Sequence, residues 1–358
     1  MPRIVISGYY GFGNLGDELI LSALLRELKK LSPGSDVVVL SHDPERTQRE
    51  HKVRAVSRWN LFAVARALVG ADLLISGGGG LLQDKSGIQT PLYYLGVILI
   101  AKLLGKPVVA WGQGMGPLQH GLNQFLCRRI LGLASLIMVR DQASLDLLRQ
   151  LGLPPEKLVL GADLVLGLSQ SSSLKKKGPD KAGILVILRR GMSPEEESAL
   201  CDFLGHAHSL TRLPLVFLSF QDEQDFEFIQ RVRSNLPFET FLSLPRLELE
   251  VLLPLFSGSK LVLSMRYHAL ILAALAGTPA LGLSSSPKID AFLHGFGQIS
   301  LAPDGLLARD EALGQFREVW KKRAVFQKSL KKGVRQSHAR LKAAEAKLKE
   351  LLGPVFQH

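Results

Sequence analysis

Residues 260–290 read KLVLSMRYHALILAALAGTPALGLSSSPKID and indicate how the second half of the chain folds. The stretch Lys260–Met265 is short and apolar, which predicts a buried strand. The apolar run Tyr267–Ala276 predicts a helix, which the following Gly-Thr-Pro sequence ends. A second strand is predicted at Ala280–Ser284. This order of strand, helix and strand is typical of a parallel α/β sheet.

Three side chains that carry or can accept a positive charge follow these two strands. Arg266 and His268 come after the first strand, and Lys288 comes after the second. Ligands of open α/β sheets bind outside the carboxyl ends of the strands, so we expect all three at one edge. Cations beside a helix N-terminus favour an anion, and His268 can exchange a proton near neutral pH. The alternative for His268 is a packing role at the start of an apolar helix.

Length and composition predict a two-domain globular protein of the cytoplasm. The chain has 358 residues, more than one ordinary core accommodates, and 46% of them are hydrophobic against 21% charged. Cys127 and Cys201 are the only cysteines, and their separation suits neither a disulfide framework nor a metal site. His206 and His208 lack a third ligand in the sequence, so we expect no metal. Apolar runs stay shorter than the ~20 residues that a bilayer span needs.

The order of predicted elements divides the chain. Strands and helices alternate through residues 1–168, which predicts a Rossmann-like, doubly wound N-terminal domain. Residues 169–181, SQSSSLKKKGPDK, have no apolar face and are predicted to be a linker. The alternation restarts over residues 182–308 as a second Rossmann-like domain. Residues 309–358 are predicted to form basic C-terminal helices.

A glycine-rich loop follows the first predicted strand. It reads GYYGFGNLG over Gly8–Gly16, and Asp17 is predicted to cap the next helix. Glycine lets a backbone approach a ligand closely, but this spacing does not match the dinucleotide fingerprint G-x-G-x-x-G. We therefore expect Gly13, Asn14 and Asp17 to bind a substrate, with tight strand–helix turns alone as the alternative.

Four more polar residues follow predicted strands. Arg140 ends a buried strand, where a cation is costly unless a carboxylate or an anionic ligand accompanies it. Arg189 ends the first strand of the second half in the same way. Asp84 and Gln113 add hydrogen-bonding groups at the edge of the first sheet, although such residues are more often structural. We expect all four to contribute to substrate binding.

Several segments in order resemble one protein family, and they extend over about Met1–Leu293. These segments are GYYGFGNLGDELIL, SGGGGLLQD, YYLGVILIAKLLGKPVVAWGQGMGPL, VRDQASLDLL, SMRYHALILAALAGTP and SSSPKIDAFL. Together they are similar to the polysaccharide pyruvyl transferases, specifically the CsaB type. One departure is Ser284-Ser285-Ser286, where the family often has an aromatic and an acidic residue, and it bears on acceptor specificity.

The resemblance implies a fold like the GT-B glycosyltransferases, with two Rossmann-like domains facing a cleft. It implies transfer of the pyruvyl unit of phosphoenolpyruvate to two hydroxyls of a sugar, giving a ketal and phosphate. In the CsaB type the acceptor is a lipid-linked precursor of a cell-wall polymer that anchors S-layer proteins. Phosphoenolpyruvate is then a co-substrate and no cofactor is expected. Arg140, Arg266 and Lys288 would bind it, His268 would move the proton, and Asp17 and Asp84 would bind or deprotonate the acceptor.

Net charge is +12, and the excess is concentrated near the end of the chain. Residues 321–350 contain eleven Lys or Arg and two Glu, with an apolar stripe at Leu330, Val334, Leu341, Leu348 and Leu352. This pattern predicts attraction to an anionic membrane surface or to a polyanionic substrate. Because the resemblance implies a lipid-linked acceptor, we expect peripheral binding to the inner face of the membrane. A solvated helix face is the alternative. Nucleic acid is not an expected partner, because no binding motif is present and aromatics are only 7%.

Two other functions compete with pyruvyl transfer. A GT-B glycosyltransferase would use a nucleotide sugar and hold its ribose with an acidic residue, for which Asp290 and the Glu residues around Leu249 are the candidates. A non-enzymatic protein that binds cell-wall polymer would need no proton carrier. Loss of His268 would then leave ligand binding intact.

Overall fold

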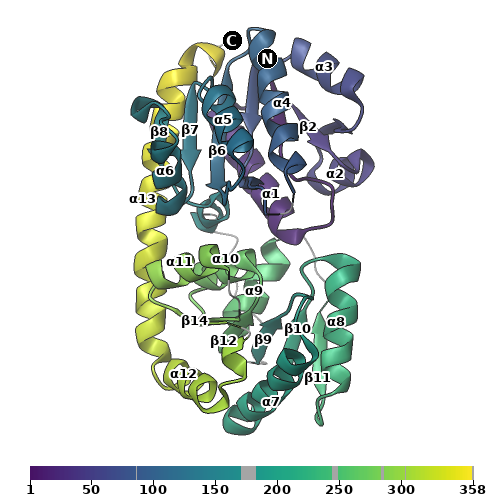
Figure 1. Ribbon diagram of the computed structural model, residues 1–358, viewed down its shortest axis with the longest axis vertical. Coiled ribbons are helices and arrows are strands. Elements are labelled where there is room, and N and C mark those ends of the chain that lie inside the picture. Colours follow the sequence, from purple (N-terminus) through teal and green to yellow (C-terminus); the bar gives the residue numbers. More distant parts are fainter. Residues whose placement is uncertain (86, 171–182, 244–248, 284–285, 303, 357–358) are drawn as a thin grey trace. The chain divides into compact units, whose positions relative to one another are not determined.

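The computed structural model describes residues 1–85, 87–170, 183–243, 249–283, 286–302 and 304–356. The chain forms two compact units, drawn in Figure 1. Unit 1 comprises Met1–Leu168 and Ser337–His358, and unit 2 comprises Ser169–Gln336. Each unit has a parallel β-sheet with helices around it, which confirms the predicted α/β class with two Rossmann-like units.

The sheet of unit 1 has eight strands, and the chain reverses direction within it. Its order is β3-β2-β1-β4-β6-β7-β8, with β5 pairing β6. The chain runs outward from β1 to β3 and then returns to β4 on the other side of β1, so β1 and β4 flank the topological switch point. Ligands of doubly wound sheets bind at this point. The strands are β1 (Arg3–Ser7), β2 (Asp36–Ser41), β3 (Arg54–Ser57), β4 (Leu73–Ser76), β5 (Gly79–Leu82), β6 (Val108–Met115), β7 (Leu136–Val139) and β8 (Leu158–Leu160).

A side-chain cap fixes where the first helix of unit 1 begins. Asn14 is the N-cap of the first helix, because its Oδ1 accepts a hydrogen bond from the Gly16 amide at 3.0 Å. The helix therefore starts at Leu15, and Asp17, which we predicted to cap it, lies in its first turn. The helices are α1 (Leu15–Leu31), α2 (Pro44–His51), α3 (Leu61–Val69), α4 (Gln89–Leu103), α5 (Gly121–Leu126), the π-helix η1 (Cys127–Leu131), α6 (Gln142–Gln150) and the short η2 (Pro155–Lys157) and η3 (Leu164–Gln170).

Unit 2 repeats this plan with six strands. The order is β11-β10-β9-β12-β13-β14, so its switch point lies between β9 and β12. The helix predicted at Tyr267–Ala276 is confirmed without any shift. The strands are β9 (Ile184–Ile187), β10 (Leu215–Leu218), β11 (Thr240–Ser243), β12 (Leu261–Ser264), β13 (Ala280–Leu283) and β14 (Ile299–Leu301). The helices are α7 (Pro194–Thr211), α8 (Asp222–Ser234), α9 (Leu249–Gly258), α10 (Tyr267–Ala276), α11 (Pro287–Gly295), η5 (Asp304–Leu306) and α12 (Arg309–Lys321).

The basic tail belongs to both units. Its last helix, α13 (Arg323–Phe356), is continuous, but residues up to Gln336 belong to unit 2 and residues from Ser337 belong to unit 1. Leu330, Leu341 and Leu348 are buried, while Lys328, Lys331, Lys332 and Arg335 are exposed. The predicted apolar stripe therefore packs inward at these three leucines. Of the predicted linker, Ser169 and Gln170 end η3, and the rest lies outside the described residues.

Within the described part of the chain, no helix is both long enough and apolar enough to cross a bilayer.

Glu27 should make the stability of unit 1 depend on pH. Burial raises the pKa of this α1 carboxyl to about 7, against the opposing hydrogen bond from Trp111 Nε1 to its Oε2 at 3.0 Å, and Glu345 of α13 raises it further. The folded pKa lies above the ordinary value, so protonation favours the folded state. The stabilisation is complete below the ordinary pKa and is lost as pH rises through 7.

We expect unit 1 to lose up to about 3 kcal/mol of unfolding free energy between roughly pH 5 and pH 8. Glu27→Gln keeps an oxygen that accepts from Trp111 but cannot ionise, so it should flatten this dependence. Urea denaturation at both pH values measures the effect. An equal pH dependence in Glu27→Gln and parent would show that Glu27 is not the group responsible.

Candidate functional site

Arg266 lies at the carboxyl end of β12, and the buried carboxylate of Asp225 holds it in place. Its Nε lies 2.9 Å from Asp225 Oδ2, its Nη2 lies 2.6 Å from Asp225 Oδ1, and Nη2 also donates to Gln221 Oε1 at 3.1 Å. The Asp225 side chain is fully buried, and that of Arg266 is 14% exposed. Such bidentate pairs are short and geometrically specific. Arg266 is therefore a fixed cation with one exposed side.

Two more arginines lie beside this pair at the end of β9, the strand that neighbours β12. Arg189 and Arg190 are both exposed, and the Arg189 amide donates to Met265 Sδ at 3.3 Å. Burial raises the pKa of Asp225, while Arg266, the Arg190 amide and the Arg189 charge oppose that rise. Asp225 thus has the Arg266 guanidinium as its ion-pair partner and the Arg189 charge nearby, so positive charge is in excess at this edge. We call Arg189, Arg190, Arg266 and Asp225 the arginine cluster.

His268 lies in the first turn of α10, two residues beyond Arg266, and is half-buried. Its ring meets that of Tyr267 edge to face with centroids 5.2 Å apart, and Tyr267 in turn contacts Phe292 at 5.4 Å. Arg266 is the N-cap of α10, and its guanidinium has no acceptor atom that could cap the helix amides. The N-terminus of α10 therefore adds its partial positive charge to the same edge.

Lys288 is exposed in the first turn of α11 and follows β13, the next strand along the sheet. Of the serine tripeptide before it, Ser286 is the N-cap of α11, whereas Ser284 and Ser285 lie outside the described residues. Asp290 accepts a hydrogen bond from Ser300 Oγ at 2.5 Å. The structure thus places Arg189, Arg266, His268 and Lys288 after three neighbouring strands of unit 2.

The buried carboxylate of Glu18 holds the glycine-rich loop of unit 1 in place. The Gly11 amide donates to Glu18 Oε1 at 2.8 Å, and Glu18 Oε2 contacts His51 Nε2 at 2.9 Å. Gly11 has φ +79°, and a Cβ there would lie 2.2 Å from Ser41 Oγ, so only glycine fits. Glu18, His51 and Glu50 have ligand-type atoms within 4.8 Å of one another. Both Glu18 oxygens are already engaged, so the group acts as a clamp.

Asp17 lies where the loops after β1 and β4 meet. A Cβ built on Gly79 would be 3.2 Å from Asp17 Oδ1, so the carboxylate approaches the backbone that follows β4. Gly13 has φ +73°, and Asn14 caps α1. Asp17, Gly13 and Asn14 therefore lie together at the switch point of unit 1, as the sequence predicts for a ligand-binding turn.

Asp84 and Gln113 support loops at this edge. Asp84 accepts hydrogen bonds from the amides of Gln119 and His120 at 2.9 Å, and from Asn123 Nδ2 at 3.3 Å. Desolvation raises the pKa of Asp84, but these bonds outweigh it and hold the pKa below its usual value. Gln113 is fully buried, and its Nε2 donates to Ser76 and to the Gly77 carbonyl. Asp84 therefore holds the backbone at residues 119–120, and Gln113 holds the backbone at residues 76–77.

Arg140 has carboxylate partners, which was one of the two alternatives left open by the sequence. Its Nη1 lies 3.2 Å from Asp163 Oδ2, and its Nε lies 3.4 Å from Asp141 Oδ2. The Arg140 and Asp163 side chains are 3% and 2% exposed. A guanidinium enclosed in this way stabilises unit 1 around Gly114, where a Cβ would lie 2.6 Å from it.

Sequence reasoning missed Arg58, which is enclosed by aromatic rings at the same edge. Its guanidinium carbon lies 4.0–5.3 Å from the ring centroids of Phe12, Trp59, Tyr93 and Tyr94, and its Nη1 donates to the Gly8 carbonyl at 3.0 Å. Arginine over aromatic faces is stabilised by the ring quadrupoles. Arg58 therefore anchors the glycine-rich loop. No local pattern marks it, because Phe12 of the glycine-rich loop and Tyr93 and Tyr94 of α4 are distant from it in the sequence.

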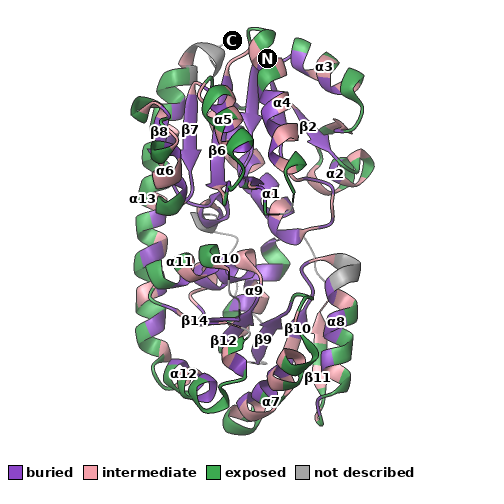
Figure 2. Cartoon of the chain, in the orientation of Figure 1, coloured by how far each residue is buried: buried purple, intermediate pink, exposed green. Residues whose placement is uncertain are grey.

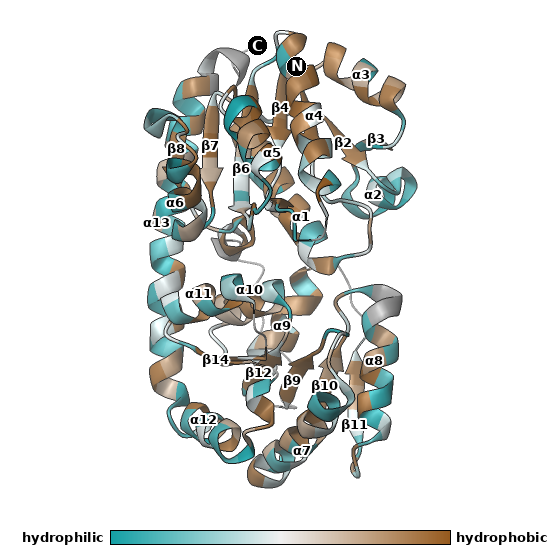
Figure 3. Ribbon diagram, viewed as in Figure 1, coloured by the Kyte–Doolittle hydropathy of each residue, from teal (hydrophilic) through white to brown (hydrophobic). Residues whose placement is uncertain are grey.

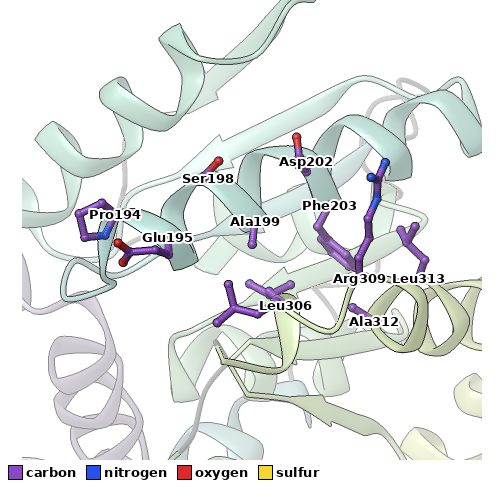
Figure 4. A pocket seen from close by; sticks show the side chains of 11 residues that line it. Pro194, Glu195, Ser198, Ala199, Asp202, Phe203, Leu306, Arg309, Ala312 and Leu313 are labelled. Carbon is purple, nitrogen blue, oxygen red and sulfur yellow. The ribbon is translucent and has the colours of Figure 1, made fainter.

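A cavity on unit 2 does not involve these residues. It has a volume of about 560 Å³ and lies between α7 and the segment that contains η5 and α12. Figure 4 shows Glu195, Ser198 and Asp202 on α7, opposite Leu306 and Arg309. None of the residues that line this cavity is a predicted site residue. The cavity is therefore separate from the candidate site.

Comparison with solved structures shows the fold that the two units share with other proteins. MnaA of S. aureus, solved with UDP, matches with a TM-score of 0.69 and 12% identity over 99% of this chain and 97% of that chain. Anabaena Alr3699/HepE, solved with UDP-glucose, matches with a TM-score of 0.64 and 13% identity over 97% of this chain and 100% of that chain. The UDP-GlcNAc 2-epimerase of Methanocaldococcus jannaschii matches with a TM-score of 0.61 and 13% identity over 87% of this chain and 92% of that chain. At these identities the likeness concerns the fold alone.

Comparison with curated proteins gives no match. The family model described as polysaccharide pyruvyl transferase matches residues 14–287. This range includes the N-cap Asn14, Asp17, all four members of the arginine cluster and His268, and it ends at Pro287, the first residue of α11. The chain belongs to the polysaccharide pyruvyl transferase family.

Proposed function

We propose that the protein transfers the pyruvyl unit of phosphoenolpyruvate to two hydroxyls of one sugar in a lipid-linked cell-wall polysaccharide precursor. Family membership supports pyruvyl transfer to a polysaccharide. The observation that carries the donor is the arginine cluster, where the Arg266 guanidinium pairs with Asp225 and the charge of Arg189 lies nearby. Phosphoenolpyruvate has a phosphate and a carboxylate, and arginine binds both in a bidentate manner.

The chemistry needs one proton carrier and fixed positive charge. Proton transfer to the methylene carbon of phosphoenolpyruvate makes an oxocarbenium-like centre. One sugar hydroxyl attacks this centre, and the proton of that hydroxyl replaces the one that the acid gave to carbon. The C–O bond to phosphate then breaks, the second hydroxyl attacks, and its proton leaves with the phosphate. His268 is proposed as the acid, because it follows Arg266 at the edge that carries the cluster. The arginines and Lys288 stabilise the departing phosphate.

The acceptor is assigned to the switch point of unit 1. Asp17 is proposed to bind or deprotonate a sugar hydroxyl, with Gly13 and Asn14 shaping the loop beside it. Asp84, Gln113 and Arg140 would act indirectly, by fixing the loops and strand ends they contact. The scheme uses no resident metal or cofactor. We place the protein in the cytoplasm, with peripheral binding at the inner face of the membrane.

A nucleotide-sugar glycosyltransferase is the alternative, because MnaA and HepE of similar fold were solved with UDP and UDP-glucose. Such a site needs a carboxylate for the ribose, and the candidate Asp290 is already hydrogen-bonded to Ser300. Isothermal titration of the protein with phosphoenolpyruvate and with UDP-glucose separates the two. Binding of UDP-glucose but not phosphoenolpyruvate would favour the glycosyltransferase.

Lys288→Ala and Arg189→Ala should each weaken phosphoenolpyruvate binding by about tenfold or more. Losing a charge-assisted hydrogen bond costs about 1.5–3 kcal/mol, and both residues are exposed, so the variants should fold. Isothermal titration measures the dissociation constant. Arg212→Ala removes an exposed arginine at the C-cap of α7 and should leave binding unchanged. Parent-like affinity in both Lys288→Ala and Arg189→Ala would remove these residues from the donor site.

A further inference from the structure

One stretch of unit 1 is almost devoid of negative charge. Residues 51–140 contain ten Lys or Arg but only two acidic residues, Asp72 and Asp84. Asp84 is buried, and Asp72 accepts a hydrogen bond from the Arg3 amide at 2.7 Å. Most of this stretch consists of α3, α4, α5 and η1 with the strands between them. The outer surface of these helices is therefore positively charged, with no exposed acidic group within the helices themselves.

These helices cover the same face of the sheet. Val64 and Leu68 of α3, Leu95 and Ile98 of α4, and Leu131 of η1 pack into one core cluster with inward residues of the central strands. Figure 1 shows α3, α4 and α5 together on the near side of unit 1. Side chains on their opposite sides therefore point away from the sheet. We call this outer surface the α3–α5 face.

Large apolar side chains are exposed on the α3–α5 face. Phe62 is 77% exposed, Leu103 is 79% exposed and Phe125 is 54% exposed. Among the described residues, eleven of the eighteen exposed large apolar side chains come from residues 59–133. Figure 2 shows exposed positions on α3, α4 and α5, and Figure 3 colours α3 and α4 largely hydrophobic. The eleven are Trp59, Leu61, Phe62, Val69, Ile88, Leu99, Leu103, Leu104, Leu122, Phe125 and Leu133.

We propose that the α3–α5 face binds the surface of an anionic lipid bilayer, with its apolar side chains entering the headgroup region. Interfacial binding grows with the apolar area that leaves water and with attraction between basic residues and anionic lipid. Arg66, Lys85, Arg128 and Arg129 are exposed in or beside these helices and supply that charge. The face combines both contributions without a carboxylate to repel the lipid.

A second copy of the chain fits this face less well. A two-fold interface would bring the same patch of both copies together and place arginine against arginine without carboxylates between them. The basic tail also differs from the α3–α5 face. Its inward leucines are buried, and its exposed large apolar side chains among the described residues are Val325 and Leu351. The tail offers attraction by charge, whereas the α3–α5 face also offers side chains that insert.

The test is sedimentation of the full chain with vesicles of phosphatidylglycerol and phosphatidylcholine, and with vesicles of phosphatidylcholine alone. The triple variant Phe62→Ser, Leu103→Ser and Phe125→Ser should lower the partition coefficient on anionic vesicles by at least about tenfold. The matched control Leu210→Ser, Phe241→Ser and Val251→Ser removes three exposed apolar side chains outside both the tail and the α3–α5 face. The partition coefficient of this control on anionic vesicles should stay within about twofold of that of the parent.

A variant with Gln at Lys328, Lys331, Lys332 and Arg335 distinguishes vesicle binding through the tail from vesicle binding through the α3–α5 face. We expect this variant to keep the salt-resistant part of binding that insertion provides. Loss of all binding in the tail variant together with parent-like binding of the triple variant would overturn the proposal. So would a parent that is dimeric by analytical ultracentrifugation and a triple variant that is monomeric, because the face would then be an interface between copies.

Trp59 gives an independent readout, because it is 59% exposed beside α3, whereas Trp111 is fully buried. Brominated lipid should quench part of the parent fluorescence when vesicles are added, and Trp59→Phe should lose that part. Quenching that is equal in parent and Trp59→Phe would contradict insertion at this end of the face. Neither experiment needs substrate, so its failure leaves the proposed pyruvyl transfer untouched.

Discussion

Replacing His268 with glutamine should lower turnover by about 10²–10⁴-fold while phosphoenolpyruvate still binds. Glutamine is close to histidine in size and polarity, so the contact with Tyr267 and the start of α10 should persist. It cannot deliver a proton to the methylene carbon. The cations that would bind the donor remain in place, because Asp225 fixes Arg266. Phosphate release and isothermal titration measure the two effects separately.

His294→Gln is the matched control, since it removes an exposed histidine at the far end of α11. It should leave both turnover and donor affinity unchanged. If His268→Gln retains turnover within a few-fold of the parent, His268 has a packing role and another residue supplies the proton. A loss of donor affinity as large as the loss of turnover would assign His268 to binding.

Removing Arg266 should have the second large effect, on stability as well as on binding. Arg266→Ala leaves the fully buried Asp225 carboxylate without its guanidinium partner. Breaking a buried ion pair from one side costs about 3–5 kcal/mol. We expect unit 2 to lose free energy of unfolding of that order, measured by urea denaturation, and phosphoenolpyruvate affinity to fall as well.

The double variant Arg266→Met and Asp225→Leu separates these two consequences. Replacing both members of a buried pair by apolar residues of similar volume is often neutral for stability. The double variant should therefore be far more stable than Arg266→Ala and still bind phosphoenolpyruvate weakly. Arg231→Ala breaks an exposed arginine–carboxylate pair with Glu197 and should leave stability unchanged. A double variant with parent-like donor affinity would show that the arginine cluster only stabilises unit 2.

The pattern of residues 260–290 predicted β12, α10 and β13 to within one residue at each end, because apolar runs ended by glycine and proline are local signals. The same reasoning placed Arg266, His268 and Lys288 at one edge, since parallel strands share their carboxyl edge. The short edge strands β8, β11 and β14 were not predicted, because three or four residues with little alternation carry no clear period.

The partners of the charged residues could not be predicted, because they are distant in sequence. Asp225 lies 41 residues before Arg266, and Asp163 lies 23 residues after Arg140. Arg58 is enclosed by the ring of its neighbour Trp59 and by rings from the glycine-rich loop and from α4. The division of α13 between the two units was also not visible, since its helical period continues without a break at residue 336.

The most direct measurement is product analysis after incubation of the protein with phosphoenolpyruvate and a panel of lipid-linked disaccharides. Pyruvyl transfer predicts that one acceptor gains the mass of pyruvate less one water, with one phosphate released per product. The new group should be acid-labile, as a ketal is, and absent with His268→Gln. Phosphate release without any modified acceptor, or sugar transfer from UDP-glucose to the same panel, would contradict the account.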